Sequence, residues 1–212
     1  MISSPVSKKE AKPTLAATFR KLVHFLEAEK VPYVLVGGIA AGLQGNPRVT
    51  EDVDVMITLA SSKILKLAEA AAKEGFDVTP ELAETQWLAS GFVRFWFGPP
   101  GKQVAADLMA CNSEFLREAS WRAQQAPCFG LRVPIGTPED MIIFKLAAWR
   151  EKDVPDARAI FIRHEDKLDK AYLRRWCAWF AAKNPCFREM PRCLEALLEG
   201  GPLPPGKPQR FR

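Results

Sequence analysis

Tyr33–Thr58 reads YVLVGGIAAGLQGNPRVTEDVDVMIT and is the most informative stretch of the sequence. Its first four residues form a β-prone run. Gly37 and Gly38 permit a tight turn and a close approach of the backbone to a ligand. The IAAGLQG segment that follows is typical of a helix opening, whose free N–H groups attract an anion. The pattern therefore predicts a strand, a phosphate-binding Gly-Gly turn and a short helix.

The same stretch ends in a second predicted strand that carries two carboxylates. Asp52 and Asp54 alternate with valines, so both acids point to one face of the strand. A divalent cation would relieve their repulsion and desolvation, and Mg²⁺ is commonly held by one or two carboxylates together with substrate phosphates. The alternative is a solvated strand end, because the neighbouring Thr50 and Glu51 are also polar.

Two other nucleotide-binding motifs are absent from the sequence. No G-x-G-x-x-G can be drawn through the glycines of this region, and no G-x-x-x-x-G-K-[ST] occurs anywhere in the chain. A Gly-Gly turn after a strand is common, so alone it is weak evidence of phosphate binding. The combination of such a turn with a D-x-D strand is far more specific.

This combination resembles the signature of the DNA polymerase β-like nucleotidyltransferase superfamily, a Gly-Gly or Gly-Ser followed by D-x-D. It is similar in particular to the AbiEii-type toxin nucleotidyltransferases and the minimal nucleotidyltransferase group. The residues that carry the resemblance are Gly37, Gly38, Ala40, Arg48, Thr50, Asp52 and Asp54. The resemblance implies metal binding by the two aspartates and nucleotide binding by Gly37, Gly38, Arg48 and Thr50. The Gly-Ser form has a hydroxyl for phosphate, and backbone N–H groups would replace it here.

A third acid, Asp107, lies within the apolar run Gln103–Met109. An ionised Asp inside a sheet is costly unless it is paired or bound to metal. The alternative is a capping role for the next helix, but Asn112 and Ser113 are already placed for that. The superfamily that the chain resembles usually has a third metal carboxylate on a neighbouring strand, and the resemblance implies that Asp107 is this residue.

A second region places a lysine and two acids after a well-marked helix start. Residues 137–140, TPED, offer an N-cap threonine, a proline at the first helical position and acids in the first turn. The pattern from there to Asp156 resembles the C-terminal motifs of AbiEii-like enzymes. The resemblance implies that Lys145 meets the triphosphate and that Asp153 or Asp156 assists catalysis. The alternatives are a snorkelling lysine and an N-cap role for Asp153.

Composition limits the class of protein. The 212 residues are 48% apolar, which is enough for a core. The sequence contains no run of about 18 apolar residues, so no membrane-spanning helix is predicted. The N-terminal MISSPVSKKEAKP lacks an apolar signal core, and the five cysteines form no C-x-x-C, as expected of free thiols in a reducing compartment. We therefore expect a cytoplasmic protein that does not bind membranes.

The net charge of +5 resides at the two ends of the sequence. Residues 1–12 carry a net +2 and residues 200–212 a net +3, so the body is formally neutral. Basic tails can hold RNA, although most are simply solvated. An acidic metal site also implies compensating basic surface nearby, for which the candidates are Arg94, Lys102, Arg158, Arg163, Arg174 and Arg175.

The predicted fold class is α/β (α+β), a small mixed β-sheet of nucleotidyltransferase type flanked by helices and followed by a helical C-terminal part. We expect a flexible N-terminus (1–13), a nucleotidyltransferase core (14–135), a helical part (136–199) and a flexible basic tail (200–212). Further strands are expected at 91–97 and 103–109, with an edge strand at 127–133. Helices are expected at 15–29, 61–74, 138–151, 154–163, 168–182 and 187–199. The aromatic residues of the helical part could stack on bases, but their spacing favours a core stripe; they are Trp149, Phe161, Tyr172, Trp176, Trp179 and Phe180.

Together, the residues and the resemblance predict a Mg²⁺- or Mn²⁺-dependent nucleotidyltransferase that moves an NMP from an NTP to an acceptor hydroxyl. The toxin resemblance implies an RNA acceptor, a tRNA end, and a cognate antitoxin protein as partner. Two alternatives stay open: transfer to a protein or small molecule, and a noncatalytic antitoxin or interaction module of the same fold. The second has no need to bury three acids.

Overall fold

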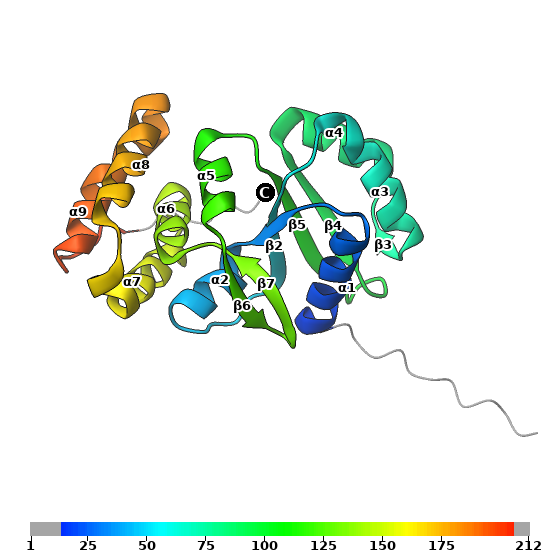
Figure 1. The fold of residues 1–212 in the computed structure, drawn as a ribbon, viewed down its shortest axis with the longest axis horizontal. Helices are drawn as coiled ribbons and strands as arrows, with labels where there is room; N and C mark the ends of the chain where they lie inside the picture. Colours follow the sequence, from blue (N-terminus) through cyan, green and yellow to red (C-terminus); the bar gives the residue numbers. More distant parts are fainter. Residues whose placement is uncertain (1–13, 206–212) are drawn as a thin grey trace, which may run out of the picture.

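The computed structural model describes residues 14–205 as one β-sheet with helices on both sides (Figure 1). The strands are β1 (Tyr33–Leu35), β2 (Asp52–Ile57), β3 (Phe76–Asp77), β4 (Phe92–Phe97), β5 (Val104–Ala110), β6 (Gln124–Cys128) and β7 (Leu131–Ile135). The α-helices are α1 (Leu15–Ala28), α2 (Gly37–Gln44), α3 (Ile64–Lys73), α4 (Pro80–Ser90), α5 (Glu114–Arg122), α6 (Pro138–Ala148), α7 (Asp153–His164), α8 (Lys170–Lys183) and α9 (Met190–Leu198). The N-terminus predicted at 1–13 and residues 206–212 of the predicted tail lie outside the described residues.

The seven strands form a mixed sheet in the order β3-β4-β5-β2-β1-β7-β6. β2 runs parallel to β5 and β1 runs parallel to β7, whereas the other neighbours are antiparallel. In the register of β2 and β5, Asp54 lies opposite Asp107. This mixed sheet flanked by helices confirms the predicted fold class.

The two faces of the central strands differ in chemistry because side chains alternate along each strand. Val53 and Val55 of β2 and Leu108 of β5 are buried, and α1 packs against these two strands. The opposite face of the same strands carries Asp54 and Asp107. The alternation that the sequence predicted for β2 therefore separates a core face from a face that carries acids.

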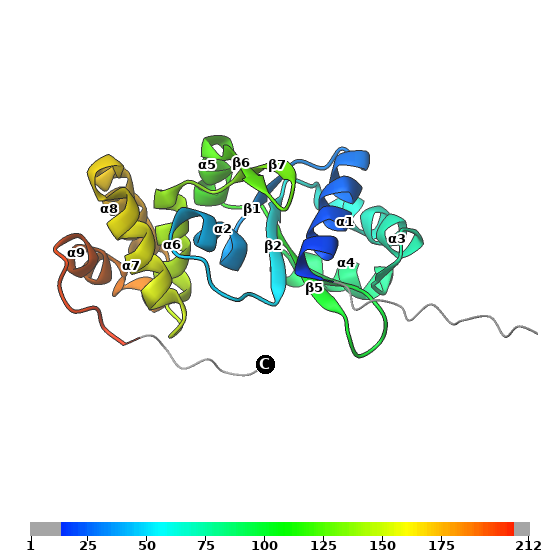
Figure 2. The same cartoon turned by 90° about the horizontal axis from the view of Figure 1, so that it is seen from below.

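Helices α6 to α9 gather on the opposite side of the molecule from α1, α3 and α4 (Figures 1 and 2). α6 contacts α2, α7, α8 and α9, so it connects the sheet side to the helical side. The Thr137 hydroxyl accepts a hydrogen bond from the Asp140 N–H, which confirms the predicted cap. On α8, Tyr172 and Trp176 are buried, and Phe115 of α5 meets Trp176 edge-on at 5.3 Å, which confirms the predicted core stripe.

Two predicted elements are corrected by the structure. Residues 127–133 are not one edge strand but parts of the β6–β7 hairpin, because Phe129 and Gly130 both adopt positive φ (46° and 84°) and reverse the chain. α6 ends at Ala148 rather than at 151, because Trp149 also adopts a left-handed conformation (φ 44°). No helix within residues 14–205 has the length and apolar content needed to cross a membrane.

Candidate active site

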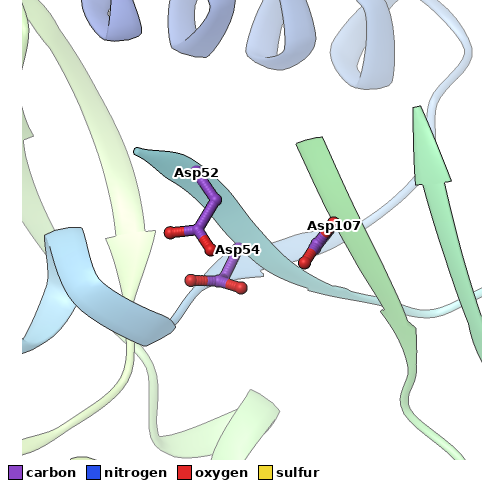
Figure 3. A group of neighbouring side chains, drawn as sticks. All are labelled: Asp52, Asp54 and Asp107. Carbon is purple, nitrogen blue, oxygen red and sulfur yellow. The ribbon is translucent and has the colours of Figure 1, made fainter. Parts of the chain in front are cut away.

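Three acidic side chains converge on one face of the sheet. Asp52 and Asp54 come from β2, and Asp107 comes from the neighbouring β5 (Figure 3). One carboxylate oxygen from each residue lies within 4.8 Å of the other two. The parallel register of β2 and β5 produces this meeting, because opposite residues share a face. The structure thus brings together the three acids that the sequence predicted as metal ligands.

Asp54 is the acid most affected by this crowding. Burial, followed by the charges of Asp52 and Asp107, raises the pKa of Asp54 from 3.8 to about 6. The Gly38 N–H and the charge of Lys145 act in the opposite direction without cancelling the rise. A divalent cation would stabilise a carboxylate whose ionised form is this unfavourable.

The Gly-Gly turn lies directly against the acids, at the N-terminus of α2. Gly37 has a φ of 67°, and a Cβ there would lie 1.8 Å from Oδ2 of Asp54. A Cβ on Gly38 would lie 2.5 Å from the hydroxyl oxygen of Thr50. Larger residues would therefore displace the side chains around the turn, and glycine lets the α2 N-terminus open onto the acidic group. The Gly38 N–H makes a long hydrogen bond, 3.4 Å, to Oδ2 of Asp54.

Thr50 and Arg48, from the loop that precedes β2, hold neighbouring acids. The Thr50 hydroxyl donates to Oδ1 of Asp52 at 2.9 Å. Arg48 donates from Nε and Nη2 to the Asp156 carboxylate at 2.9 to 3.1 Å. Charge-assisted bonds of this two-pronged form fix the guanidinium plane as well as its position. The contact ties the loop before β2 to α7, far away in the sequence.

Lys145 of α6 is buried between the two acids of α7 that the sequence singled out. Its Nζ lies 3.1 Å from Oδ1 of Asp153 and 2.9 Å from Oδ2 of Asp156. Arg150 donates to Asp153 from its backbone N–H at 3.0 Å and from its side-chain Nε at 2.7 Å. Burial alone would raise the pKa of Asp153, but these hydrogen bonds and the charge of Lys145 lower it below its usual value. Lys145 is therefore not a snorkelling surface residue.

Asp153 is the first residue of α7, and the N-cap position belongs to Lys152. The capping role that was the alternative for Asp153 is thus wrong, because its carboxylate is taken up by Arg150 and Lys145. Asp153 and Asp156 are paired with three cations, Lys145, Arg150 and Arg48. The cluster therefore has a net charge of +1 and lies beside the acidic face of the sheet.

Arg94 of β4 pairs with Asp107, a contact that the sequence did not predict. Its Nε and Nη2 donate to the two oxygens of Asp107 at 2.6 and 2.7 Å, and the two residues are cross-strand partners. Arg94 is thus the basic candidate found at the acids. Four of the other five lie in different contacts: Arg158 and Arg163 donate to the carbonyls of Gly201 and Gly45, and Arg174 and Arg175 pair with Glu195 and Glu118. This contact depends on the register between β4 and β5, which cannot be read from the sequence.

A cavity of about 360 Å³ joins these groups. Its wall includes the three acids, both glycines of the turn, Arg48, Lys145, Arg150 and Asp153. Thr50 and Asp156 do not line this cavity but contact residues that do: Thr50 contacts Asp52, and Asp156 contacts Arg48 and Lys145. The apolar part of the wall was not predicted and consists of Val36, Phe92, Met109, Met141, Phe144 and Ala148.

Another cavity, of about 430 Å³, lies between α6, α9 and residues 202–205, and none of the predicted site residues lines it.

The donor set of the acidic group fits a hard divalent cation such as Mg²⁺ or Mn²⁺. All three side chains offer carboxylate oxygens, which these ions prefer, and their mutual repulsion is what a cation would relieve. Arg94 occupies both oxygens of Asp107, but a carboxylate has about four lone-pair sites and keeps capacity for a further ligand.

Comparison with known proteins gives structural matches but no sequence match. No protein-family model and no curated protein matches the chain. An antigenic nucleotidyltransferase-like protein from Paracoccidioides brasiliensis superposes with a TM-score of 0.52 at 18% identity, over 89% of this chain and 95% of that one. The chain has a nucleotidyltransferase-like fold. The antibiotic-resistance factor ANT(2'')-Ia, in its solution structure, gives a TM-score of 0.52 at 13% identity, over 81% of this chain and 96% of that one. At these identities the matches show the fold alone, and the closer resemblance to AbiEii-type toxins stays a prediction.

Proposed function

We propose that the protein is a metal-dependent nucleotidyltransferase that moves an NMP from an NTP to the hydroxyl of an RNA end, a tRNA in particular, as the toxin of a toxin–antitoxin pair. One observation carries the chemistry: Asp52, Asp54 and Asp107 converge in a cavity that also holds the Gly37-Gly38 helix start. The shared fold supports this transferase chemistry. The RNA acceptor and the antitoxin partner rest on the toxin resemblance and the basic tails.

In this proposal the three aspartates hold Mg²⁺ or Mn²⁺. When bound, the ion supplies a Lewis acid that activates the acceptor hydroxyl and neutralises charge on the leaving pyrophosphate. The α2 N-terminus offers its N–H groups to the phosphates, and Arg48 and Lys145 add positive charge on the same side of the cavity. Asp156 pairs with Arg48 and Lys145, and Asp153 pairs with Lys145 and Arg150, so we assign both acids as positioning residues that fix where the positive charge lies.

A small-molecule acceptor is the second candidate. It is favoured by the similarity to the antibiotic-resistance factor ANT(2'')-Ia. Both candidates use the same acids and the same nucleotide site, and they differ only in what approaches the metal. A noncatalytic module of the same fold is less well supported, because three crowded carboxylates destabilise a fold that makes no use of them.

The test is transfer of label from α-phosphate-labelled NTPs, with Mg²⁺, to total RNA, to protein or to small acceptors. We expect label on RNA with the wild-type protein and none with Asp52→Asn. Asp166→Asn, which removes an exposed acid outside the cavity, is the matched control and should keep full transfer. Label on protein alone, with RNA untouched for all four NTPs, would reject the RNA acceptor. A lack of any label, together with a lack of metal-dependent NTP binding by calorimetry, would reject the enzyme.

A further inference from the structure

Strand β4 presents an unusual strip on the face of the sheet that carries the acids. Phe92, Arg94 and Trp96 alternate along the strand, so all three point to the side occupied by Asp107. Phe92 and Trp96 are 38% and 37% exposed, whereas Val93 and Phe95, which point to the other side, are completely buried. What sets these two aromatic side chains apart from other exposed apolar residues is that they share one face of a strand and lie beside a polar site, which makes them a candidate binding surface.

The strip is continuous with the candidate active site. Phe92 lines the cavity that holds the acids, and Trp96 lines an adjoining cavity of about 380 Å³ between β4 and α4. Arg94 lines both cavities, and its contact with Asp107 connects the strip to the acidic group. A ligand lying on the strip would therefore reach from α4 to the acids.

The groups assigned to the triphosphate lie on the other side of the acids. Gly37 and Gly38 begin α2 after β1, and β1 is next to β2 on the side away from β5 and β4. Lys145, on α6, contacts residues of α7, and α6 and α7 both contact α2. With the nucleotide on that side, the direction left for the acceptor is along β5 and β4, where the strip lies.

We propose that Phe92, Arg94 and Trp96 bind the unpaired bases at the 3′ end of an RNA acceptor. This proposal rests on the proposed function and specifies where the enzyme binds its acceptor. The guanidinium of Arg94 lies 5.2 Å from the centre of the Trp96 ring, as in a cation–π contact. Aromatic rings and arginine planes are the surfaces on which single-stranded bases stack, and arginine also pairs with the intervening phosphates. A strip in which an arginine lies between two aromatic residues matches this repeating chemistry of base and phosphate.

The test uses a fluorescein-labelled RNA hexamer with a free 3′-hydroxyl, and the same hexamer without bases, in anisotropy titrations. The hexamer should bind the wild-type protein, and the abasic form should bind at least about tenfold more weakly, since stacking is lost while the phosphates remain. Trp96→Ala should weaken binding of the base-containing hexamer by about the same factor, and Trp96→Phe should largely restore it. Trp121→Ala is the matched control, because Trp121 is 91% exposed on α5 and lines neither cavity.

Each outcome bears on one of the two proposals. Equal binding of the two hexamers by the wild-type protein overturns the stacking site without any variant being needed. Unchanged hexamer binding by both Trp96→Ala and Phe92→Ala does so as well. Binding of a nonhydrolysable NTP analogue in the presence of metal is measured in parallel by calorimetry, and it should be the same for Trp96→Ala as for the wild type. If that nucleotide binding is absent from the wild-type protein, the proposed function fails; if it is present while the base-containing hexamer does not bind, only the acceptor proposal fails.

Discussion

Asp54 is the residue at which the requirements of the site and of the fold oppose each other. Its carboxylate is buried next to two other acids, and its pKa is raised to about 6. The glycine at position 37 is required for the same reason, because a Cβ there would occupy the place of the Asp54 carboxylate. A fold that needed only stability would replace this aspartate with a neutral residue.

We therefore expect Asp54→Asn to stabilise the metal-free protein at neutral pH. The pKa of Asp54 is higher in the native state than in the unfolded state, so the native state binds the proton of this carboxyl more tightly. The free energy of unfolding of the wild type therefore falls as pH rises from about 4 through 6. A shift of about two pKa units corresponds to at most about 3 kcal/mol. Urea unfolding in EDTA should show the variant to be more stable than the wild type by about 1–3 kcal/mol at pH 7.5, and the difference should shrink towards pH 4.5.

The pH dependence is what distinguishes this explanation from a general effect of the substitution. Asp166→Asn, an exposed change, should show no such difference at either pH. Adding Mg²⁺ at pH 7.5 should stabilise the wild type and leave Asp54→Asn nearly unchanged, since the variant lacks one proposed ligand. A stabilisation of Asp54→Asn that is equal at both pH values would contradict the assignment.

At the scale of elements, the junction of α6 and α7 depends on one lysine. Lys145 lies between two carboxylates of α7, and Arg48 brings the loop before β2 to the same place. Because ion pairs that lose one buried partner leave an uncompensated charge, Lys145→Met should destabilise the protein by about 3–5 kcal/mol, measured by urea unfolding. Arg48 and Arg150 still face the two acids, which favours the lower end of that range.

Lys152→Met provides the control for Lys145. Lys152 lines the same cavity, and none of the ion pairs within residues 14–205 includes it. Its replacement should change the free energy of unfolding by less than about 0.5 kcal/mol. Similar destabilisation by both substitutions would mean that the cavity wall in general, rather than the Lys145 ion pairs, stabilises the junction.

Elements with a strong local signal were predicted, and those determined by distant contacts were not. The Thr137 cap, the D-x-D strand and the Gly-Gly helix start all depend on neighbours in sequence. α4 was not predicted although Thr79-Pro80-Glu81 is a helix-start signal, because only Ala83 and Trp87 face the core and the apolar period is faint. The pairs Arg94–Asp107 and Arg48–Asp156 could not be predicted, since each depends on strand register or helix packing.

Across the whole chain, the positive charge that could bind a polyanion such as RNA lies in a different part of the sequence from the acids of the candidate active site. The excess of positive charge lies at the ends of the sequence, while the body that holds the acids is formally neutral. Residues 206–212 carry three positive charges, from Lys207, Arg210 and Arg212, and lie outside the described residues. If the acceptor is RNA, these charges should add affinity by counterion release and take no part in nucleotide binding.

Replacing Lys207, Arg210 and Arg212 with glutamine, at unchanged length, should therefore weaken RNA binding most at low salt. For single-stranded RNA, the slope of log K against log salt should become shallower by up to about 2, because three phosphate contacts are lost at about 0.7 each. Anisotropy titrations of the RNA hexamer at several salt concentrations measure this slope. NTP binding and the free energy of unfolding should match those of the wild type, since the three acids, Lys145 and the core lie elsewhere in the chain. A slope equal to that of the wild type would show that Lys207, Arg210 and Arg212 do not contact RNA, and the acceptor would then be held by the rest of the chain.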